Sequence, residues 1–194
     1  MGRNAKPKPK IHITQAKDAA AYGLLLNCRH CTHDQLLEYI SENRIGRYAA
    51  YQLIERVDIQ DGYVYRLTEK GYRAFDQNTA VNNFRYHSNA IEHDIALADR
   101  YIAVHREHPN CVWRNEEDLK HDRRELADEL REHGRYAAAE RLMSTSVPDC
   151  KVIISAGVSM AIEIATSNYT QADIEAKEDF CTEMQIDHFV CERI

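Results

Sequence analysis

A change of hydrophobic period after Arg56 constrains the fold of this chain more than any other feature. Between Thr32 and Arg56, apolar residues recur at the spacing of two short amphipathic helices, separated by a break at residues 43–46. After Arg56 they alternate with polar residues on both sides of Asp61-Gly62. Asp-Gly between two such runs is a strong signal for a β-hairpin closed by a type I′ turn. The sequence therefore predicts a pair of helices followed by a two-stranded hairpin.

The two ends of this stretch complete the pattern. Thr32 and Gln35 have the spacing of a helix capping box, and residues 68–75 predict a closing helix. Helix, turn, helix, hairpin and helix is the order of the winged helix-turn-helix. The run Tyr65-x-Leu67-Thr68-x-x-Gly71 resembles the wing exit of many winged-helix DNA-binding proteins. We expect residues 12–77 to form such a domain.

The second helix of the pair carries the candidate DNA contacts. In a helix-turn-helix this helix enters the major groove, where Arg reads guanine and Gln reads adenine. Some of its tyrosines must instead belong to the core, and a winged helix used for protein docking stays an alternative. The candidate DNA-binding residues of this helix and the hairpin are Arg44, Arg47, Tyr48, Tyr51, Gln52, Arg56 and Arg66.

Charge is divided unevenly along the chain. Residues 1–75 carry 12 Lys and Arg against 8 Asp and Glu, whereas the remaining residues carry 13 against 23. This division indicates that only the first part faces nucleic acid. Residues 1–11 contain alternating Pro and Lys and few apolar side chains, which predicts a flexible basic arm. Such an arm would lie along phosphates or in a minor groove, or would serve only as a solubilising tail.

The overall composition is that of an ordinary soluble protein. The 194 residues are 44% apolar and 29% charged, enough for two small domains. No apolar run approaches the roughly 18 residues of a membrane helix, and the N-terminus lacks a signal-peptide pattern, so we expect a cytoplasmic protein. Six cysteines without a framework spacing predict reduced thiols. Cys28 and Cys31 are either half of a zinc site or two packed thiols at a turn.

Residues 84–194 predict a second domain of mixed α and β structure. A long helix is expected at 84–107 and a strand at 111–114. Residues 116–143 predict a charged helical insertion, either a solvated arm or a dimerisation arm of a homodimer. Its leucines with the spacing of a helix-pairing seam are Leu119, Leu126 and Leu130.

Two acidic residues are predicted to face each other across a second hairpin. Strands are expected at 151–154 and 159–165, joined by a turn centred on Ala156. Residues whose numbers sum to 312 then pair, so Asp149 faces Glu163, with Cβ atoms about 4.5–5.5 Å apart. Two carboxylates at this distance repel unless a proton or a divalent cation lies between them. A one-residue change in the turn would abolish the pairing.

These acidic residues belong to a pattern that resembles the core of the PD-(D/E)xK nuclease fold. The matching residues are Pro148-Asp149 and Glu163-Ile164-Ala165. Ala165 stands where the family has its lysine, and Lys177 on the following helix would take that role, as in some relatives. The resemblance implies catalytic residues Asp149, Glu163 and Lys177. Mg²⁺ would be bound by Asp149 and Glu163, and His93 or Glu92 could add to the metal shell.

The opposite interpretation is a degenerate nuclease fold that has lost its activity and whose carboxylates have only a structural role. The missing lysine and the acidic charge of this half favour that interpretation, because a nuclease must bring phosphate to its site.

The whole order resembles the replication-relaxation family of plasmids and integrative elements. The resemblance implies an α/β protein with an N-terminal winged helix-turn-helix and a restriction-endonuclease-like core. Its function would be that of a DNA-binding accessory protein in replication, mobilisation or transcription control of a mobile element. The implied partners are duplex DNA and other replication or mobilisation proteins. Two alternatives are a metal-dependent DNA endonuclease targeted by the winged helix, and a protein-interaction adaptor that binds no nucleic acid.

Overall fold

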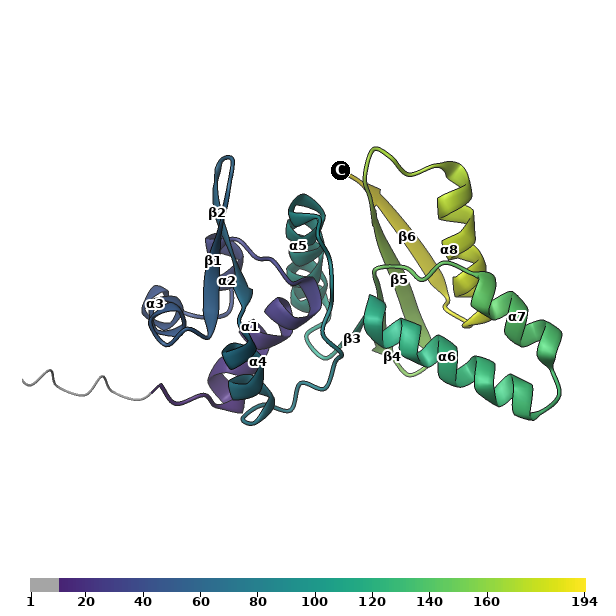
Figure 1. Ribbon diagram of the computed structural model, residues 1–194, viewed down its shortest axis with the longest axis horizontal. Coiled ribbons are helices and arrows are strands. Elements are labelled where there is room, and N and C mark those ends of the chain that lie inside the picture. Colours follow the sequence, from purple (N-terminus) through teal and green to yellow (C-terminus); the bar gives the residue numbers. More distant parts are fainter. Residues whose placement is uncertain (1–10) are drawn as a thin grey trace, which may run out of the picture.

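The computed structural model describes residues 11–194 and has a mixed α/β fold with two sheets (Figure 1). The predicted basic arm lies outside the described residues, apart from Ile11. The helices are α1 (Gln15–Cys28), α2 (His33–Leu37), α3 (Glu42–Ala50), α4 (Glu69–Asp76), α5 (Ile91–Glu107), α6 (Glu116–Glu132), α7 (Tyr136–Ser144) and α8 (Gln171–Glu183). The strands are β1 (Ile54–Ile59), β2 (Gly62–Leu67), β3 (Val112–Asn115), β4 (Cys150–Ser155), β5 (Val158–Ala165) and β6 (His188–Arg193).

Three helices, a hairpin and a fourth helix form the N-terminal region, residues 11–76. The predicted capping box begins α2. The Thr32 hydroxyl accepts a hydrogen bond from the Gln35 N–H at 3.2 Å, and the Gln35 side chain accepts one from the Thr32 N–H at 2.8 Å. These bonds satisfy two N–H groups that a helix start leaves free. The helix pair and the hairpin form in the predicted order, but their boundaries differ. The break predicted at residues 43–46 lies inside α3, and residues 38–41 separate the two helices instead. β1 begins at Ile54, before the predicted change of period after Arg56.

The Thr68-x-x-Gly71 motif has a structural explanation at the start of α4. The Thr68 N–H donates to the Leu53 carbonyl at 3.0 Å, and the Thr68 hydroxyl accepts from the Gly71 N–H at 3.0 Å. This brings α4 so close to the preceding chain that a Cβ on Gly71 would lie 1.9 Å from the Leu53 oxygen. Gly71 is thus required by the close backbone approach.

The predicted first hairpin is present, but its turn lies one residue earlier than expected. β1 and β2 pair antiparallel from Ile54↔Leu67 to Ile59↔Gly62, which leaves Gln60 and Asp61 as the turn. The predicted type I′ turn at Asp61-Gly62 is wrong, because Asp61 is not among the residues with positive φ. Gly62 instead opens β2 at φ 143°, a conformation that glycine adopts readily.

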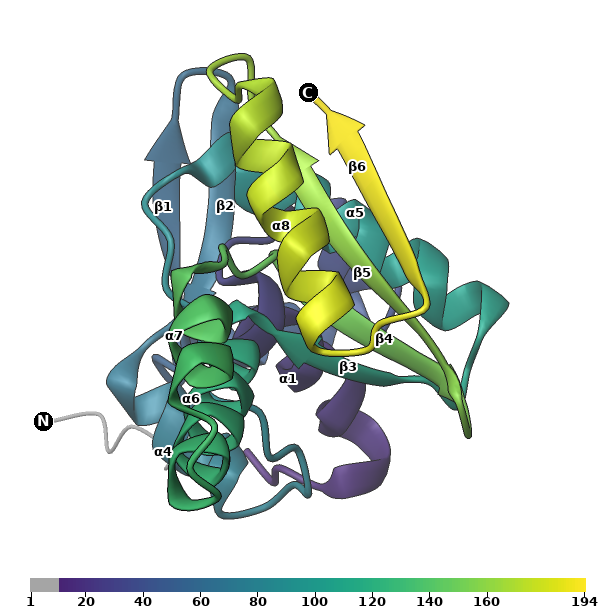
Figure 2. The same cartoon turned by 90° about the vertical axis from the view of Figure 1, so that its right-hand side faces the viewer.

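Four strands form one sheet in the C-terminal region, residues 91–194, in the order β3-β4-β5-β6. The first three strands pair antiparallel, and β6 pairs parallel with β5 after the crossover through α8. α5 lies on one side of the sheet, and α6 and α8 lie on the other (Figures 1 and 2). This arrangement places the ends of β4 and β5 between α5 and α8.

The long helix predicted at 84–107 begins only at Ile91. The preceding segment, residues 77–90, forms no helix or strand because its polar groups bond to distant parts of the chain. The Phe84 N–H donates to Asp118 Oδ1 at 2.7 Å, and the Tyr86 N–H donates to the Leu26 carbonyl at 3.2 Å. The segment between the two predicted domains is therefore bound to both of them.

The N-terminal and C-terminal regions also share one buried hydrophobic core. α5 packs against α1 on one side and β5 on the other, and in Figure 1 it lies between the two regions. One cluster of buried side chains contains Leu24 and Tyr48 from the first region and Trp113, Val152 and Ile164 from the second. α5, predicted as part of the second domain, is thus the element that joins the regions.

The predicted leucine seam is covered within the chain. Leu126 and Leu130 pack against a small cluster formed by α6 and α7, while Leu119 is buried in a separate cluster against α8. Gly134, at φ 74°, lies at the reversal between α6 and α7. Because α7 occupies the seam, these leucines are not an open surface for a second copy of the chain.

Candidate functional site

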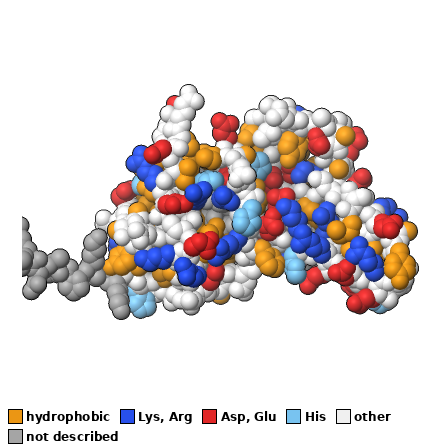
Figure 3. Space-filling view, in the orientation of Figure 1, with side chains coloured by type: hydrophobic (Ala, Val, Ile, Leu, Met, Phe, Trp, Pro, Cys, Tyr) orange, Lys and Arg blue, Asp and Glu red, His pale blue; other side chains and the backbone are white. Residues whose placement is uncertain are grey.

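An exposed group of polar and basic side chains surrounds a hollow of about 650 Å³ between α3, β1 and α4. Gln52, Arg56, Lys70 and Arg73 line this hollow together with the acidic Glu55 and Glu69, and all six side chains are exposed. We call Gln52, Arg56, Lys70 and Arg73 the α3–α4 surface. Lys70 and Arg73 donate to backbone carbonyls, and Arg56 pairs with the exposed Asp58. Figure 3 shows Lys and Arg side chains over α4 and the hairpin, with acidic side chains between them.

Two predicted DNA-binding residues belong instead to the interior of the N-terminal region. Arg44 donates through Nε and one terminal nitrogen to the fully buried Asp18 of α1, at 2.8 and 2.7 Å. Tyr48 is fully buried, and its hydroxyl also donates to Asp18. The prediction that these residues face outward is wrong, because Asp18 needs partners once α3 packs against α1. Both side chains fix α3 in place.

The remaining predicted contacts lie at or near the surface. Arg47 and Tyr51 are half-buried. Arg56 lies 3.7 Å from the centre of the Tyr63 ring, as in a cation–π contact. Arg66 pairs with Glu55 at 2.6 Å on the neighbouring strand. Of the predicted set, Gln52 and Arg56 are the residues most open to solvent.

The positive excess of residues 1–75 is not spread over the N-terminal region. Four of its 12 Lys and Arg residues lie within residues 1–10, which leaves eight against eight Asp and Glu in residues 11–75. Residues 11–75 therefore carry no net positive charge, and the Asp18–Arg44 pair removes one charge of each sign. Any basic character of this part of the chain is local to patches of its surface.

The predicted pairing of Asp149 and Glu163 is confirmed by the sheet register. β4 and β5 pair from Cys150↔Ile162 to Ile153↔Ser159, so the next pair outward is Asp149 and Glu163. A bulge between Ile153 and Ser155 changes the register only near the turn. The Asp149 N–H donates to Glu163 Oε2 at 3.1 Å, and the Ile164 N–H donates to Asp149 Oδ2 at 2.7 Å.

Two cationic side chains contact this carboxylate pair. Lys177 Nζ of α8 lies 2.8 Å from Glu163 Oε2 and also donates to the Val147 carbonyl at 2.9 Å. His93 Nε2 of α5 lies 3.0 Å from Asp149 Oδ2. The Glu163 side chain is completely buried, and those of Lys177, His93 and Asp149 are 8–10% exposed. The predicted residues thus meet, but inside the protein.

The protonation of this group follows from burial and from its neighbours. Burial alone would lower the pKa of His93, but its hydrogen bond to Asp149 and the Asp94 carboxylate 3.5 Å away outweigh it and raise that pKa to about 10. Burial and the nearby Asp149 raise the pKa of Glu163, while Lys177 opposes them. At neutral pH His93 is therefore an imidazolium, which with the Lys177 ammonium balances the charge of the carboxylates.

This arrangement fits a divalent metal ion poorly. Mg²⁺ needs open oxygen ligands, and the Oε2 and Oδ2 atoms already accept bonds from Lys177, His93 and two backbone N–H groups. Only Glu163 Oε1 of the pair is buried without a hydrogen-bond partner. Glu92, the other predicted addition to a metal shell, is exposed. Among residues 11–194, no three acidic, histidine or cysteine side chains are placed to hold a metal ion.

The buried charges continue into the N-terminal region through residues that the sequence did not single out. Asp94 follows His93 on α5 and lies 2.7 Å from Nδ1 of His30, just after α1. Burial would raise the pKa of Asp94, but the hydrogen bonds to His30 and His93 lower it. The chain of contacts His30, Asp94, His93, Asp149, Glu163 and Lys177 is called the buried charge network below. It connects α1, α5, β5 and α8.

Cys28 and Cys31 behave as packed thiols in the described structure. Both are free and completely buried, as is Cys150 nearby. Burial raises the pKa of each of these thiols well above its usual value. A neutral buried thiol is neither a good metal ligand nor a nucleophile.

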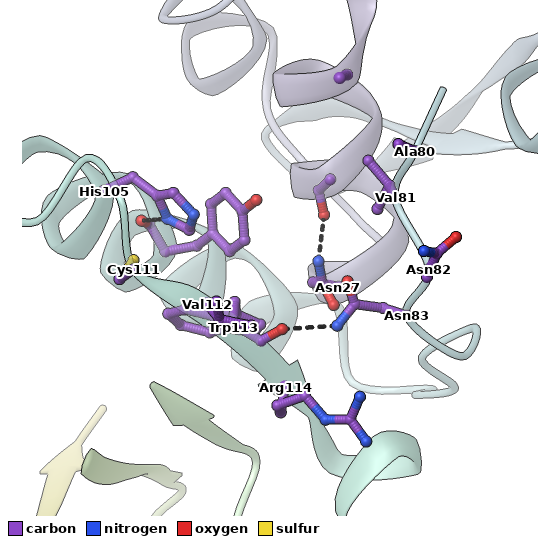
Figure 4. Close-up of a pocket in the computed structure, with 13 residues that line it drawn as sticks. Asn27, Ala80, Val81, Asn82, Asn83, His105, Cys111, Val112, Trp113 and Arg114 are labelled. Carbon is purple, nitrogen blue, oxygen red and sulfur yellow. Dashed lines mark hydrogen bonds between the residues drawn. The ribbon is translucent and has the colours of Figure 1, made fainter. Parts of the chain in front are cut away.

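A further cavity of about 350 Å³ lies where α1, residues 80–83, α5 and β3 meet (Figure 4). Tyr101 stacks on His105 with ring centres 4.0 Å apart, and Trp113 lies 4.9 Å from Tyr101. Asn83 donates to the Trp113 carbonyl at 2.7 Å across the edge of this cavity. Residues 80–83 belong to the lining of this cavity, so its walls add to the contacts that hold residues 77–90 in place.

The chain matches no protein-family model, no curated protein and no solved structure. Across residues 11–194, no helix combines the length and the apolar character that crossing a membrane requires.

Proposed function

We propose that this chain binds duplex DNA through a winged helix-turn-helix whose contact residues form the α3–α4 surface. The observation that carries the proposal is the contrast in solvent access between the two charged sites. Gln52, Arg56, Lys70 and Arg73 are exposed to solvent beside the end of α3, whereas the charges between the regions are buried and paired.

The form of α3 supports this proposal. Its exposed side includes Gly46, Ala49 and Ala50, whose small side chains let a helix backbone approach a groove closely. Arg44 and Tyr48 anchor the opposite side of the helix to Asp18. A helix held this firmly would present the α3–α4 surface in one orientation, and Arg56, Lys70 and Arg73 would contact phosphates.

In this proposal the C-terminal region is a scaffold with a degenerate PD-(D/E)xK-like core. The buried charge network fixes α5 and α8 on the sheet, and α5 holds the N-terminal region. The resemblance to the replication-relaxation family would make the protein an accessory DNA-binding factor of a mobile element. That biological setting is part of the proposal, as is a homodimer.

Salt-dependent binding to a mixed-sequence duplex, followed by fluorescence anisotropy, tests the proposal. The triple variant Arg56→Gln, Lys70→Gln, Arg73→Gln should bind at least tenfold more weakly. The slope of log K against log salt should fall by about 2–3, since each phosphate contact contributes about 0.9.

A matched control is Arg131→Gln, Arg135→Gln, Arg141→Gln, which removes the same charge from exposed positions on α6, on α7 and in the turn between them. Equal losses in both triple variants would mean that only net charge matters. No duplex binding by the wild type at low salt would contradict the DNA proposal and favour the protein-interaction adaptor.

The alternative function, a metal-dependent nuclease, is favoured by one observation: Lys177 reaches the carboxylates from α8, as the family resemblance implies for a displaced lysine. The test is Mg²⁺- or Mn²⁺-dependent nicking of supercoiled plasmid by the wild type and by Glu163→Gln. Nicking that disappears in the variant, while duplex binding stays, would establish the nuclease.

A further inference from the structure

A second basic hollow, of about 200 Å³, lies beside the hairpin and away from the end of α3. Its lining contains three arginines, Arg29, Arg66 and Arg85, together with Glu69, Tyr72 and His87. These residues come from the end of α1, from β2, from α4 and from the segment before α5. The volume is far larger than one water molecule needs. We call it the arginine hollow.

The arginines of this hollow differ in their partners. Arg66 pairs with Glu55 at 2.6 Å, and Arg85 contacts both oxygens of Glu69 at 2.8 and 3.1 Å. Arg29 Nε is buried and has no hydrogen-bond partner among the described residues. A buried guanidinium nitrogen without an acceptor is costly, so an acceptor supplied from outside would be stabilised there.

Before any ligand arrives, the Tyr72 ring contacts the Arg85 guanidinium, and the backbone at Arg29 has an uncommon conformation. Arg29 follows α1 with φ 63°, a left-handed conformation that is uncommon for a residue other than glycine. Arg85 lies 3.9 Å from the centre of the Tyr72 ring. Burial raises the pKa of Tyr72, while Arg85 and Arg29 oppose this, which places both positive charges near the ring. Preorganised donors lose less entropy on binding.

The contact between Arg85 and Glu69 indicates the charge of the acceptor. One terminal nitrogen of Arg85 donates to both oxygens of the Glu69 carboxylate, and arginine binds phosphate through the same kind of charge-assisted hydrogen bond. The Glu69 side chain is 72% exposed, so solvent can replace it at little cost when a stronger anion enters. The hollow then offers three guanidinium groups and an imidazole to one tetrahedral anion.

We propose that the arginine hollow is a phosphate-binding site, with Arg29 and Arg85 as the principal ligands. The phosphate is either a backbone phosphodiester of the duplex or a free phosphate group of a small ligand. A duplex phosphodiester as the ligand rests on the DNA-binding function proposed above, whereas a free phosphate group does not. Glu69 lines both this hollow and the α3–α4 hollow, so a duplex on the α3–α4 surface would have the site next to its backbone.

The first arm of the test uses inorganic phosphate with the full chain. The NMR signal of the Arg29 Nε–H group should shift with saturation as phosphate is added. Arg85→Gln and, separately, Arg29→Gln should weaken the binding at least tenfold by calorimetry. The control Arg106→Gln removes an exposed arginine that pairs with Glu38 on another surface, and it should bind phosphate like the wild type. Phosphate binding that is absent, or equal in all variants, would overturn the proposal.

The second arm separates the two sources by salt-dependent duplex binding. Arg85→Gln should lower the slope of log K against log salt by about 0.9 if the site holds a backbone phosphate. An unchanged slope together with lost phosphate binding would assign the site to a free phosphate ligand. If the wild type binds phosphate in this hollow but binds no duplex, the phosphate-site proposal is supported and the proposed DNA function is wrong.

Discussion

The α3–α4 surface and the buried charge network use the same kinds of side chain in opposite ways. In the first, Arg56, Lys70 and Arg73 are exposed, and Lys70 and Arg73 contact backbone carbonyls. In the second, Lys177 and His93 each contact a buried carboxylate. A cation in water can exchange its weak contacts for a phosphate, whereas a buried cation cannot leave without exposing an unpaired charge. In the function proposed above, the first site therefore binds a partner and the second has a structural role.

The sharpest test of this comparison is to remove one charge from the buried network. Lys177→Met leaves the fully buried Glu163 without its cation, so the free energy of unfolding should fall by about 3–5 kcal/mol. Urea denaturation measures the change. The double variant Lys177→Met, Glu163→Gln should recover much of the loss, because no buried charge is left unpaired. Equal instability of the single and double variants would show that Lys177 acts by packing and not by charge.

The pH dependence of stability tests the same network through His93. Its folded pKa of about 10 lies above the ordinary value of 6.5, so the native state binds the extra proton. This stabilisation is fully present below pH 6.5 and is lost as pH rises through about 10, at no more than about 1.4 kcal/mol per pH unit. The free energy of unfolding should therefore fall by about 2–3 kcal/mol between pH 7 and pH 10.

His93→Gln is the control for that profile. The variant should be less stable than the wild type at pH 7, and its stability should change less over the same pH range. Parallel profiles for the two proteins would mean that another group titrates.

Arg44, which pairs with the buried Asp18, and Arg56, which pairs with the exposed Asp58, compare two kinds of arginine within one region. Arg44→Met should destabilise the protein by about 2–3 kcal/mol, because it leaves Asp18 buried with one partner fewer. Arg56→Met should change stability by less than about 0.5 kcal/mol but weaken duplex binding. The two variants are compared by urea denaturation and by anisotropy. A large loss of stability in Arg56→Met would mean that Arg56 has a structural role, like Arg44.

Two glycines provide the smallest comparison. Gly71→Ala should cost about 1–3 kcal/mol, because its Cβ would lie 1.9 Å from the Leu53 oxygen. Gly46→Ala on α3 meets no atom within 4 Å and should stabilise the protein by about 0.5–1 kcal/mol through helix propensity. Thermal unfolding of both variants distinguishes these effects. Equal shifts would contradict the close approach of α4 to the preceding chain.

Local signals in the sequence predicted the parts of the structure that depend on neighbouring residues. The capping box at Thr32, the alternation on both sides of Asp61-Gly62 and the turn centred on Ala156 each act within a few residues. The pairing of Asp149 with Glu163 followed because the bulge at Ile153–Ser155 is confined to the turn. Lys177 came from a family resemblance, and the structure brings it to Glu163.

The errors arose where distant parts of the chain meet. Tyr48 and Arg44 turn inward because Asp18, on another helix, requires donors. Residues 84–90 fit a helical pattern but bond instead to Asp118 and to the end of α1. His30 and Asp94 gave no separate signal, since their contact joins residues 64 positions apart. Burial of a charged pair cannot be read from either residue's own neighbours in the sequence.

The measurement that tests the division of roles most directly is duplex affinity in two variants with opposite designs. The double variant Lys177→Met, Glu163→Gln alters only the buried network, and the triple variant Arg56→Gln, Lys70→Gln, Arg73→Gln alters only the α3–α4 surface. Anisotropy at low salt should give wild-type affinity for the first and at least a tenfold loss for the second. Lost binding in the folded double variant, with the triple variant unaffected, would contradict the account and place the nucleic-acid site at the carboxylates.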